Sequence, residues 1–132
     1  MRIERFASGG PYEQIYGYSR AVRAGDRVVT AGCTATVGGV VIGVGDAYAQ
    51  TVTAFGIALD ALARAGASIT DVVRTRMYVA GAAHADAAGR AHGEVFGSVR
   101  PAATLVIVAG LVHPDMLVEV EAEATLPGGT PT

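Results

Sequence analysis

The clearest alternation of apolar and polar positions lies near the end of the chain. Residues 117–123, LVEVEAE, repeat with a period of two, which predicts a β-strand. Glu119, Glu121 and Glu123 then point to one face, and the aliphatic side chains between them point to the other. Three carboxylates on one strand face are unfavourable unless that face is wet, paired or functional. Two interpretations stay open: a solvent-facing sheet edge, or a cleft in which at least one glutamate acts as an acid/base group.

A second apolar strand is predicted just before it. The run Val106 to Val108 is almost continuously aliphatic and lies between Pro101 and Gly110. The polar segment 113–115, His-Pro-Asp, then supplies a turn. These two strands are therefore predicted to form a closing hairpin.

The first part of the chain also predicts strands. Two short candidates cover Ile3 to Ala7 and Arg20 to Arg23, and a stronger one covers Arg27 to Ala35. Gly38-Gly39, between TATV and VVIG, predicts a tight hairpin turn.

Two helices are predicted after that hairpin. Asp46 is an N-cap candidate for a helix that runs to about Ala65, and Gly66 stands where a left-handed C-cap is expected. Much of the apolar face of this helix is formed by Val52, Phe55, Ile57, Leu59 and Leu62. A second, alanine-rich helix covers about Ala83 to Phe96.

Between the helices, Asp71 to Val79 alternates like a strand, with its apolar face formed by Val73, Thr75, Met77 and Val79. The resulting order of strands, helix, strand, helix and strands predicts an α+β sandwich, with both helices on one face of a mixed sheet. We expect a single domain over residues 1–126 and a flexible tail over 127–132. The helix-free face then needs a cover, and another subunit is the simplest one.

Composition narrows the class of protein. The chain has 132 residues, of which 51% are hydrophobic, with a mean hydropathy of +0.38. No run of about 18 apolar residues occurs, so no membrane span is expected. A symmetric homo-oligomer accounts for the excess apolar surface, although a wide core would also absorb it.

Charge and cysteine content add two further expectations. The net charge is −2, and the scattered arginines form no basic stripe, so nucleic-acid binding has little electrostatic support. Cys33 is the only cysteine, which excludes an internal disulfide and fits a reducing, cytoplasmic compartment.

Metal binding has little support in the sequence. His92-Gly93-Glu94 matches half of the zinc-deaminase signature, but the second half needs cysteines and none follows Cys33. His84 and His92 lie about 12 Å apart along one helix, too far to share a metal ion. Neither a metal nor a cofactor is expected.

Short segments spread over nearly the whole chain match a known family pattern in the right order. They are Gly10-Pro11-Tyr12, Val28-Val29-Thr30-Ala31-Gly32, Gln50-Thr51, Ala65-Gly66-Ala67-Ser68, Asp71-Val72-Val73-Arg74-Thr75, Val95-Phe96, Arg100-Pro101-Ala102 and Val118-Glu119-Val120-Glu121-Ala122. In these segments the chain resembles the RidA (YjgF) family. The resemblance implies a chorismate-mutase-like fold with a six-stranded mixed sheet and two helices. It also implies a homotrimer with ligand clefts between subunits, and cofactor-independent hydrolysis of enamines and imines, such as 2-aminoacrylate, to ketoacids and ammonia.

The resemblance also assigns candidate site residues. Glu119 falls where the family places its water-activating acid, with Glu121 as the alternative. Tyr12 either binds the ligand and orients the water or only packs a turn. The backbone N–H of Gly32 is a candidate ligand contact, and Cys33 either lines the pocket or is a small buried side chain.

The chain departs from the family pattern at two positions. Ala103 stands where members that act on amino-acid imines carry an arginine that binds the substrate carboxylate. Ala31 replaces the usual serine or threonine. Arg100, three residues before Ala103, either reaches an anionic ligand from the rim or has a structural role. We therefore expect an imine or enamine hydrolase with an altered substrate range. The alternative is a non-catalytic trimer that binds a small metabolite or another protein.

Overall fold

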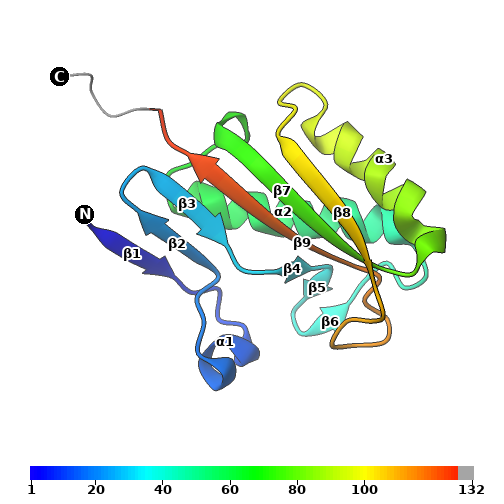
Figure 1. The fold of residues 1–132 in the computed structure, drawn as a ribbon. Helices are drawn as coiled ribbons and strands as arrows, with labels where there is room; N and C mark the ends of the chain where they lie inside the picture. Colours follow the sequence, from blue (N-terminus) through cyan, green and yellow to red (C-terminus); the bar gives the residue numbers. More distant parts are fainter. Residues whose placement is uncertain (128–132) are drawn as a thin grey trace.

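The computed structural model describes residues 1–127, so the predicted tail lies outside this range except for its first residue. One sheet runs through the molecule with two long helices packed against it (Figure 1). The elements follow the order β1 (Ile3–Phe6), α1 (Pro11–Tyr16), β2 (Ala21–Ala24), β3 (Arg27–Thr30), β4 (Cys33–Thr34), β5 (Thr36–Val37), β6 (Val40–Val41), α2 (Ala47–Arg64), β7 (Val72–Ala80), α3 (Ala85–Phe96), β8 (Ala102–Val108) and β9 (Val118–Thr125). Short 3₁₀ turns, Ile69–Asp71 and Ala82–His84, precede β7 and α3.

The sheet is mixed, as predicted. Six strands follow the order β1-β2-β3-β9-β7-β8, and the short β4 adds a seventh by pairing with β9. Only β7 and β8 run parallel, because α3 carries the chain back between them.

The predicted closing hairpin is wrong. β8 and β9 are consecutive in the sequence, but β7 lies between them and pairs with both. β9 is thus a central strand rather than the second arm of a hairpin. The aliphatic face of β9 explains this position, because Val118, Val120, Ala122 and Ala124 are all buried against the helical layer.

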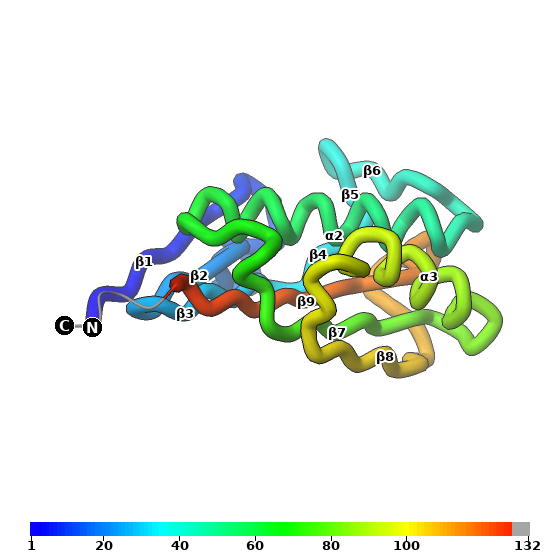
Figure 2. The backbone as a smooth tube through the Cα atoms, turned by 90° about the horizontal axis from the view of Figure 1, so that it is seen from above, coloured from blue at the N-terminus to red at the C-terminus, as the bar shows by residue number. Residues whose placement is uncertain are grey.

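α2 and α3 cover the same face of the sheet, as predicted (Figure 2). Asp46 caps α2 by accepting a hydrogen bond from the backbone N–H of Ala49 at 3.0 Å, and Gly66 adopts a left-handed φ of 97° after its end. Val52, however, is 38% exposed. Small side chains such as Ala54 and Ala58 take much of the buried face of α2, which lets the helix approach β9 closely.

β7 departs from the predicted alternation at one residue. Thr75, Met77 and Val79 are buried as expected, but Val73 is 50% exposed. The register against β9 shifts between Val72 and Arg74, so Val73 is the extra residue of a β-bulge.

Two further features concern the periphery. The Gly38-Gly39 turn joins β5 and β6 as predicted, with both glycines at positive φ. Within residues 1–127, no helix combines the length and apolar character needed to cross a membrane.

Candidate active site

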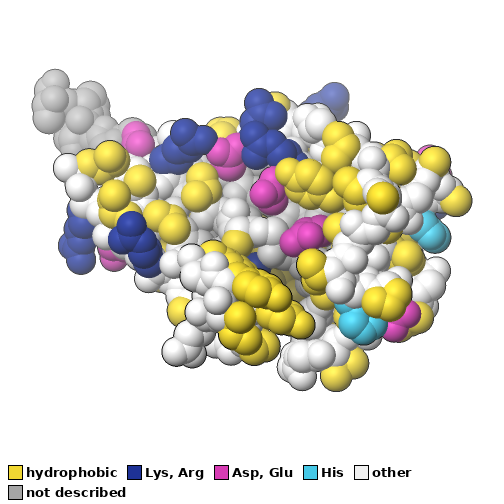
Figure 3. All heavy atoms as spheres, turned by 60° about the horizontal axis from the view of Figure 1, so that its bottom comes forward, with side chains coloured by type: hydrophobic (Ala, Val, Ile, Leu, Met, Phe, Trp, Pro, Cys, Tyr) yellow, Lys and Arg dark blue, Asp and Glu magenta, His cyan; other side chains and the backbone are white. Residues whose placement is uncertain are grey.

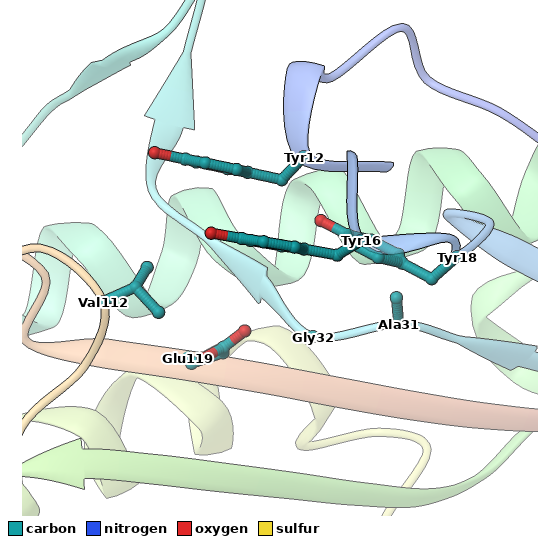
Figure 4. A pocket seen from close by; sticks show the side chains of 7 residues that line it. All are labelled: Tyr12, Tyr16, Tyr18, Ala31, Gly32, Val112 and Glu119. Atoms are coloured by element: carbon teal, nitrogen blue, oxygen red, sulfur yellow. The ribbon is translucent and has the colours of Figure 1, made fainter. Parts of the chain in front are cut away.

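A cavity of about 420 Å³ opens on the helix-free side of β9, and Figure 4 shows its walls. The structure brings together four of the predicted site residues there. These four, Tyr12, Ala31, Gly32 and Glu119, share the lining with Tyr16, Tyr18 and Val112.

A β-bulge sets Gly32 above Glu119. Val29 pairs with Glu123, and Cys33 pairs with Val120. Between these pairs, the segment that joins β3 to β4 has three residues, 30–32, whereas β9 has two, 121–122, so the first segment has one extra residue. The Thr30 hydroxyl accepts a hydrogen bond from the N–H of Ala122 at 3.1 Å and occupies the place of a ladder carbonyl. The bulge explains why the predicted long strand from Arg27 is split into β3 and β4.

Only glycine fits at the centre of this bulge without displacing Glu119. A β-carbon built on Gly32 would lie 2.8 Å from the carboxyl carbon of Glu119 and 3.2 Å from its γ-carbon. The absent side chain therefore makes room for the carboxyl group that the resemblance identifies as the acid/base group.

Arg20 holds the other side of the bulge. Its guanidinium donates a hydrogen bond to the Gly32 carbonyl at 2.5 Å and another to the Cys33 sulfur at 3.6 Å. It also pairs with the Glu13 carboxylate at 3.4 Å, and both of these charged side chains are largely buried. Arg20 is a positioning residue, because its guanidinium holds the backbone of Gly32 in place while it contacts Cys33 and Glu13 behind the cavity wall.

The same ion pair fixes α1, a helix that the sequence does not predict. Burial alone would raise the pKa of Glu13, but hydrogen bonds from Ser8 and the positive charge of Arg20 lower it below the ordinary value. Glu13 therefore stays ionised and ties the loop before α1 to the strand after it. Pro11 begins α1, and Gly17 ends it in a left-handed conformation.

α1 presents two parallel tyrosine rings to the cavity. Tyr12 and Tyr16 are four residues apart, with ring centroids 5.4 Å apart and planes 2° apart. In the view of Figure 4, Tyr16 lies between Tyr12 and Glu119. Sequence reasoning missed Tyr16, Tyr18 and Val112; the four-residue spacing of Tyr12 and Tyr16 was the available signal for the first.

Glu123, the last of the three glutamates, forms ion pairs that stabilise the sheet. It lies opposite Arg74 in the sheet and pairs with that residue at 3.6 Å, with Arg76 at 3.5 Å, and with Arg27. Such a network makes a carboxylate on a sheet face favourable.

Glu121 interacts with neighbouring side chains of β7, whereas Glu119 faces the cavity. Glu121 accepts a hydrogen bond from the Tyr78 hydroxyl at 2.7 Å and lies 3.8 Å from the Arg76 guanidinium. Burial raises the pKa of Glu119 above its ordinary value, and the negative charge of Glu121 raises it further, whereas Arg20 opposes the shift. The geometry thus separates the two candidates, because only Glu119 is part of the cavity wall.

The remaining predicted site residues lie elsewhere in the protomer. Cys33 is buried beneath the bulge, and burial raises the pKa of its thiol, so it is a small core side chain. Ala103 pairs with Thr75 on edge strand β8, and exposed Arg100 precedes that strand with a φ of 58°. β7 separates β8 from β9, so neither residue lines this cavity.

His92 is half-buried and packs against the core. One ring nitrogen lies 2.7 Å from the Thr75 hydroxyl, the ring contacts Phe55 and Phe96, and burial lowers its pKa. Within the described residues, no three His, Cys, Asp or Glu side chains are grouped so as to hold a metal ion.

Comparison with known proteins identifies the family. The family model described as Endoribonuclease L-PSP matches residues 11–126. A crystal structure of a Mycobacterium tuberculosis member of the YjgF/YER057c/UK114 family is 41% identical and superposes with a TM-score of 0.85, covering 95% of this chain and all of that one. The chain belongs to the RidA (YjgF) family.

Two further relatives extend this result. An uncharacterised protein of Streptomyces coelicolor is 49% identical over 122 residues, which cover 92% of this chain and 91% of that protein. The Escherichia coli YjgF structure is 25% identical, has a TM-score of 0.76, and covers 92% of both chains. Membership of the RidA family supports a role in binding or processing a small molecule.

Proposed function

We propose that this RidA-family protein hydrolyses an imine, an enamine or a related small electrophile without a cofactor. The observation that supports this most directly is the isolation of Glu119. It is a half-buried carboxyl group with a raised pKa at the wall of a cavity, whereas the two other glutamates of β9 are paired with neighbouring side chains. A carboxyl group whose pKa is raised by burial is suited both to accept a proton and to return it.

The reaction needs one water molecule and one proton carrier. The Glu119 carboxylate removes a proton from water as the water oxygen attacks the carbon of a protonated imine, and the electron pair of the C=N double bond moves to nitrogen. Glu119 then donates that proton to the nitrogen of the carbinolamine. The C–N bond breaks as the hydroxyl group becomes a carbonyl and loses its proton to solvent. One imine and one water give one carbonyl compound and one amine or ammonia.

Tyr12 and Gly32 are proposed as ligand contacts. Tyr12 lines the cavity, so its hydroxyl group would hydrogen-bond the ligand from the wall, and Gly32 brings its backbone close to Glu119. The electrophilic carbon would thus be held beside the carboxyl group that delivers the water.

We further propose that the cavity is one side of a cleft completed in a homotrimer. The helix-free face of the sheet has no cover within the described chain, and Val106, which pairs with Tyr78 on this face, is 40% exposed. A neighbouring subunit that covers this face would also bring a second chain to the cavity, including the edge strand with Ala103. Light scattering of the purified protein is expected to give three times the chain mass of 13.4 kDa.

The activity test uses two imines. 2-Iminobutyrate is generated in situ, and a carboxylate-free imine is made from a primary amine by a short pulse of flavin amine oxidase, which is then inhibited. We expect the protein to accelerate ammonia release from the carboxylate-free imine and to act weakly on 2-iminobutyrate, because Ala103 supplies no carboxylate-binding charge. A rate on 2-iminobutyrate equal to that of an arginine-bearing relative would refute this view of Ala103.

Replacement of Glu119 tests the chemistry. Glu119→Gln is expected to reduce the rate by a factor of about 100 or more, the scale of general acid–base catalysis. Glu121→Gln is the matched control and is expected to retain most activity at neutral pH. Full activity in Glu119→Gln would show that another group moves the proton.

A binding role is the second candidate, and the alanine at position 103, where the resemblance implies an arginine in imine-cleaving members, favours it. A binding protein would show no turnover before the Glu119→Gln change and would still hold its ligand after it. Endoribonuclease activity, which the family description names, has little support because the net charge is −2.

A further inference from the structure

Three tyrosines make one wall of the cavity unusually aromatic and open. The exposed fractions are 50% for Tyr12, 71% for Tyr16 and 40% for Tyr18. Large aromatic side chains that gather at an exposed cavity commonly mark a binding site. On the face shown in Figure 3, hydrophobic side chains gather on the lower part of the molecule, with acidic side chains beside them.

Contacts within the protomer hold this wall in place. Stacking on Tyr12 holds one face of the Tyr16 ring, and α1 itself is fixed by the buried Glu13–Arg20 pair. The Arg20 guanidinium also lies 5.6 Å from the centre of the Tyr18 ring and binds the carbonyl of Gly32. The largely buried Arg20 guanidinium thus links the tyrosine wall to Gly32, which lies beside Glu119.

The charge of the cavity favours a cation. Glu119 is the one charged side chain among the residues that line it, and tyrosine rings present negative faces. Arg20 is largely buried, and its guanidinium is directed to Glu13, Gly32 and Cys33. At the cavity wall an anionic ligand would be repelled by the Glu119 carboxylate, whereas a cationic one would pair with it; the charge of Arg20 also acts at Glu119, but its guanidinium is not part of the lining.

We propose that this cavity binds a planar, π-conjugated nitrogen cation, an aryl-substituted iminium, stacked on Tyr16 with its N–H group donated to Glu119. The inference rests on the proposed function, since it names the substrate class of that reaction. A cavity of about 420 Å³ holds a single ring with its substituent. Hydrolysis of such a substrate adds one water and gives an aryl aldehyde or ketone and an ammonium ion.

A stable amidine provides the probe. Benzamidinium is planar, aromatic and cationic, and water does not hydrolyse it under assay conditions. Benzoate keeps the ring but reverses the charge, and cyclohexanecarboxamidinium keeps the charge but loses the flat ring. Binding is measured by tyrosine fluorescence and by NMR titration; the chain has no tryptophan, and three of its five tyrosines line the cavity, so the emission reports on this site.

We expect benzamidinium to bind at least about tenfold more tightly than either analogue, the scale of one stacking or cation–π contact. Tyr16→Leu is expected to lose that advantage, and Tyr16→Phe is expected to keep it because the ring remains. Tyr48→Leu is the matched control, since Tyr48 packs beside Arg90 on the opposite, helical side of the sheet.

Three results would overturn the inference: benzoate binding as tightly as benzamidinium, equal binding of the two amidinium ions, or unchanged binding in Tyr16→Leu. Its failure is distinguishable from failure of the proposed function. Imine hydrolysis that depends on Glu119 without preference for benzamidinium refutes only the ligand class. Selective, Tyr16-dependent binding without turnover of any imine refutes only the hydrolase.

Discussion

Gly32 lies so close to Glu119 that any side chain at position 32 would overlap with the carboxyl group of Glu119. The contact joins residues 87 positions apart in the chain, and the β-bulge between β3 and β4 creates it. Because the obstructed group is the end of a flexible side chain, the conflict is resolved by moving Glu119 rather than by unfolding the sheet.

Gly32→Ala is therefore expected to impair function more than stability. Displacement of a catalytic group by about 1 Å costs on the order of 100-fold in rate, and we expect a loss of kcat/KM of about that size. The melting temperature is expected to change little. Both quantities are measured on the purified variant.

Gly56→Ala is the matched control for this change. Gly56 lies in α2 with open space where a β-carbon would stand. Alanine there is expected to keep full activity and to stabilise the protein by about 0.5–1 kcal/mol, because glycine is a poor helix former. Gly32→Ala with wild-type kcat/KM would contradict the placement of Glu119 in the site.

Gln50 is expected to be a major determinant of stability. Its side chain is fully buried and donates to the carbonyls of Gly43 and Asp115 at 3.2 and 2.8 Å, and it accepts from the N–H of Leu117 at 2.8 Å. Gln50→Ala would remove a hydrogen-bond partner from each of these three backbone groups, and the Gly43 carbonyl would keep the N–H of Asp46 at 2.9 Å. We expect a loss of about 3 kcal/mol in the free energy of unfolding, measured by urea denaturation.

Gln14→Ala provides the comparison for Gln50. Gln14 is exposed on α1, and its replacement is expected to change the free energy of unfolding by less than about 0.5 kcal/mol. Equal urea midpoints for the two variants would show that the buried amide of Gln50 adds no more to the free energy of unfolding than an exposed one.

The periodic elements of this fold could be predicted from the sequence, whereas the features that depend on pairing between distant segments could not. The alternation in β9 identified the face that Glu119 shares with Glu121, because a period of two follows from local geometry. The position of β7 between β8 and β9 was missed, because sheet order depends on the crossover through α3. α1 was missed because six residues are too short for a hydrophobic period to show.

The candidate site was predictable only in part for the same reason. Tyr12, Gly32 and Glu119 came from resemblance to the RidA family, and the cavity indeed collects them. The position of Tyr16 depended on α1, and the four-residue spacing of Tyr12 and Tyr16 was its signal in the sequence. Arg20 depended on the pairing of β2 with β3, which brings its side chain beneath Gly32.

The pH dependence of activity is expected to report the interaction between Glu119 and Glu121. The general base must be ionised, so kcat/KM rises as pH increases through the pKa of Glu119. Burial raises that pKa first, and the charge of Glu121 raises it further. Glu121→Gln removes the second contribution, and the acidic limb of the kcat/KM profile should move to lower pH.

Glu123→Gln tests whether any lost carboxylate has this effect; Glu123 does not contribute to the shift of Glu119, so its removal should leave the limb in place. An acidic limb that stays fixed or moves to higher pH in Glu121→Gln would mean that a group other than Glu119 controls the rate.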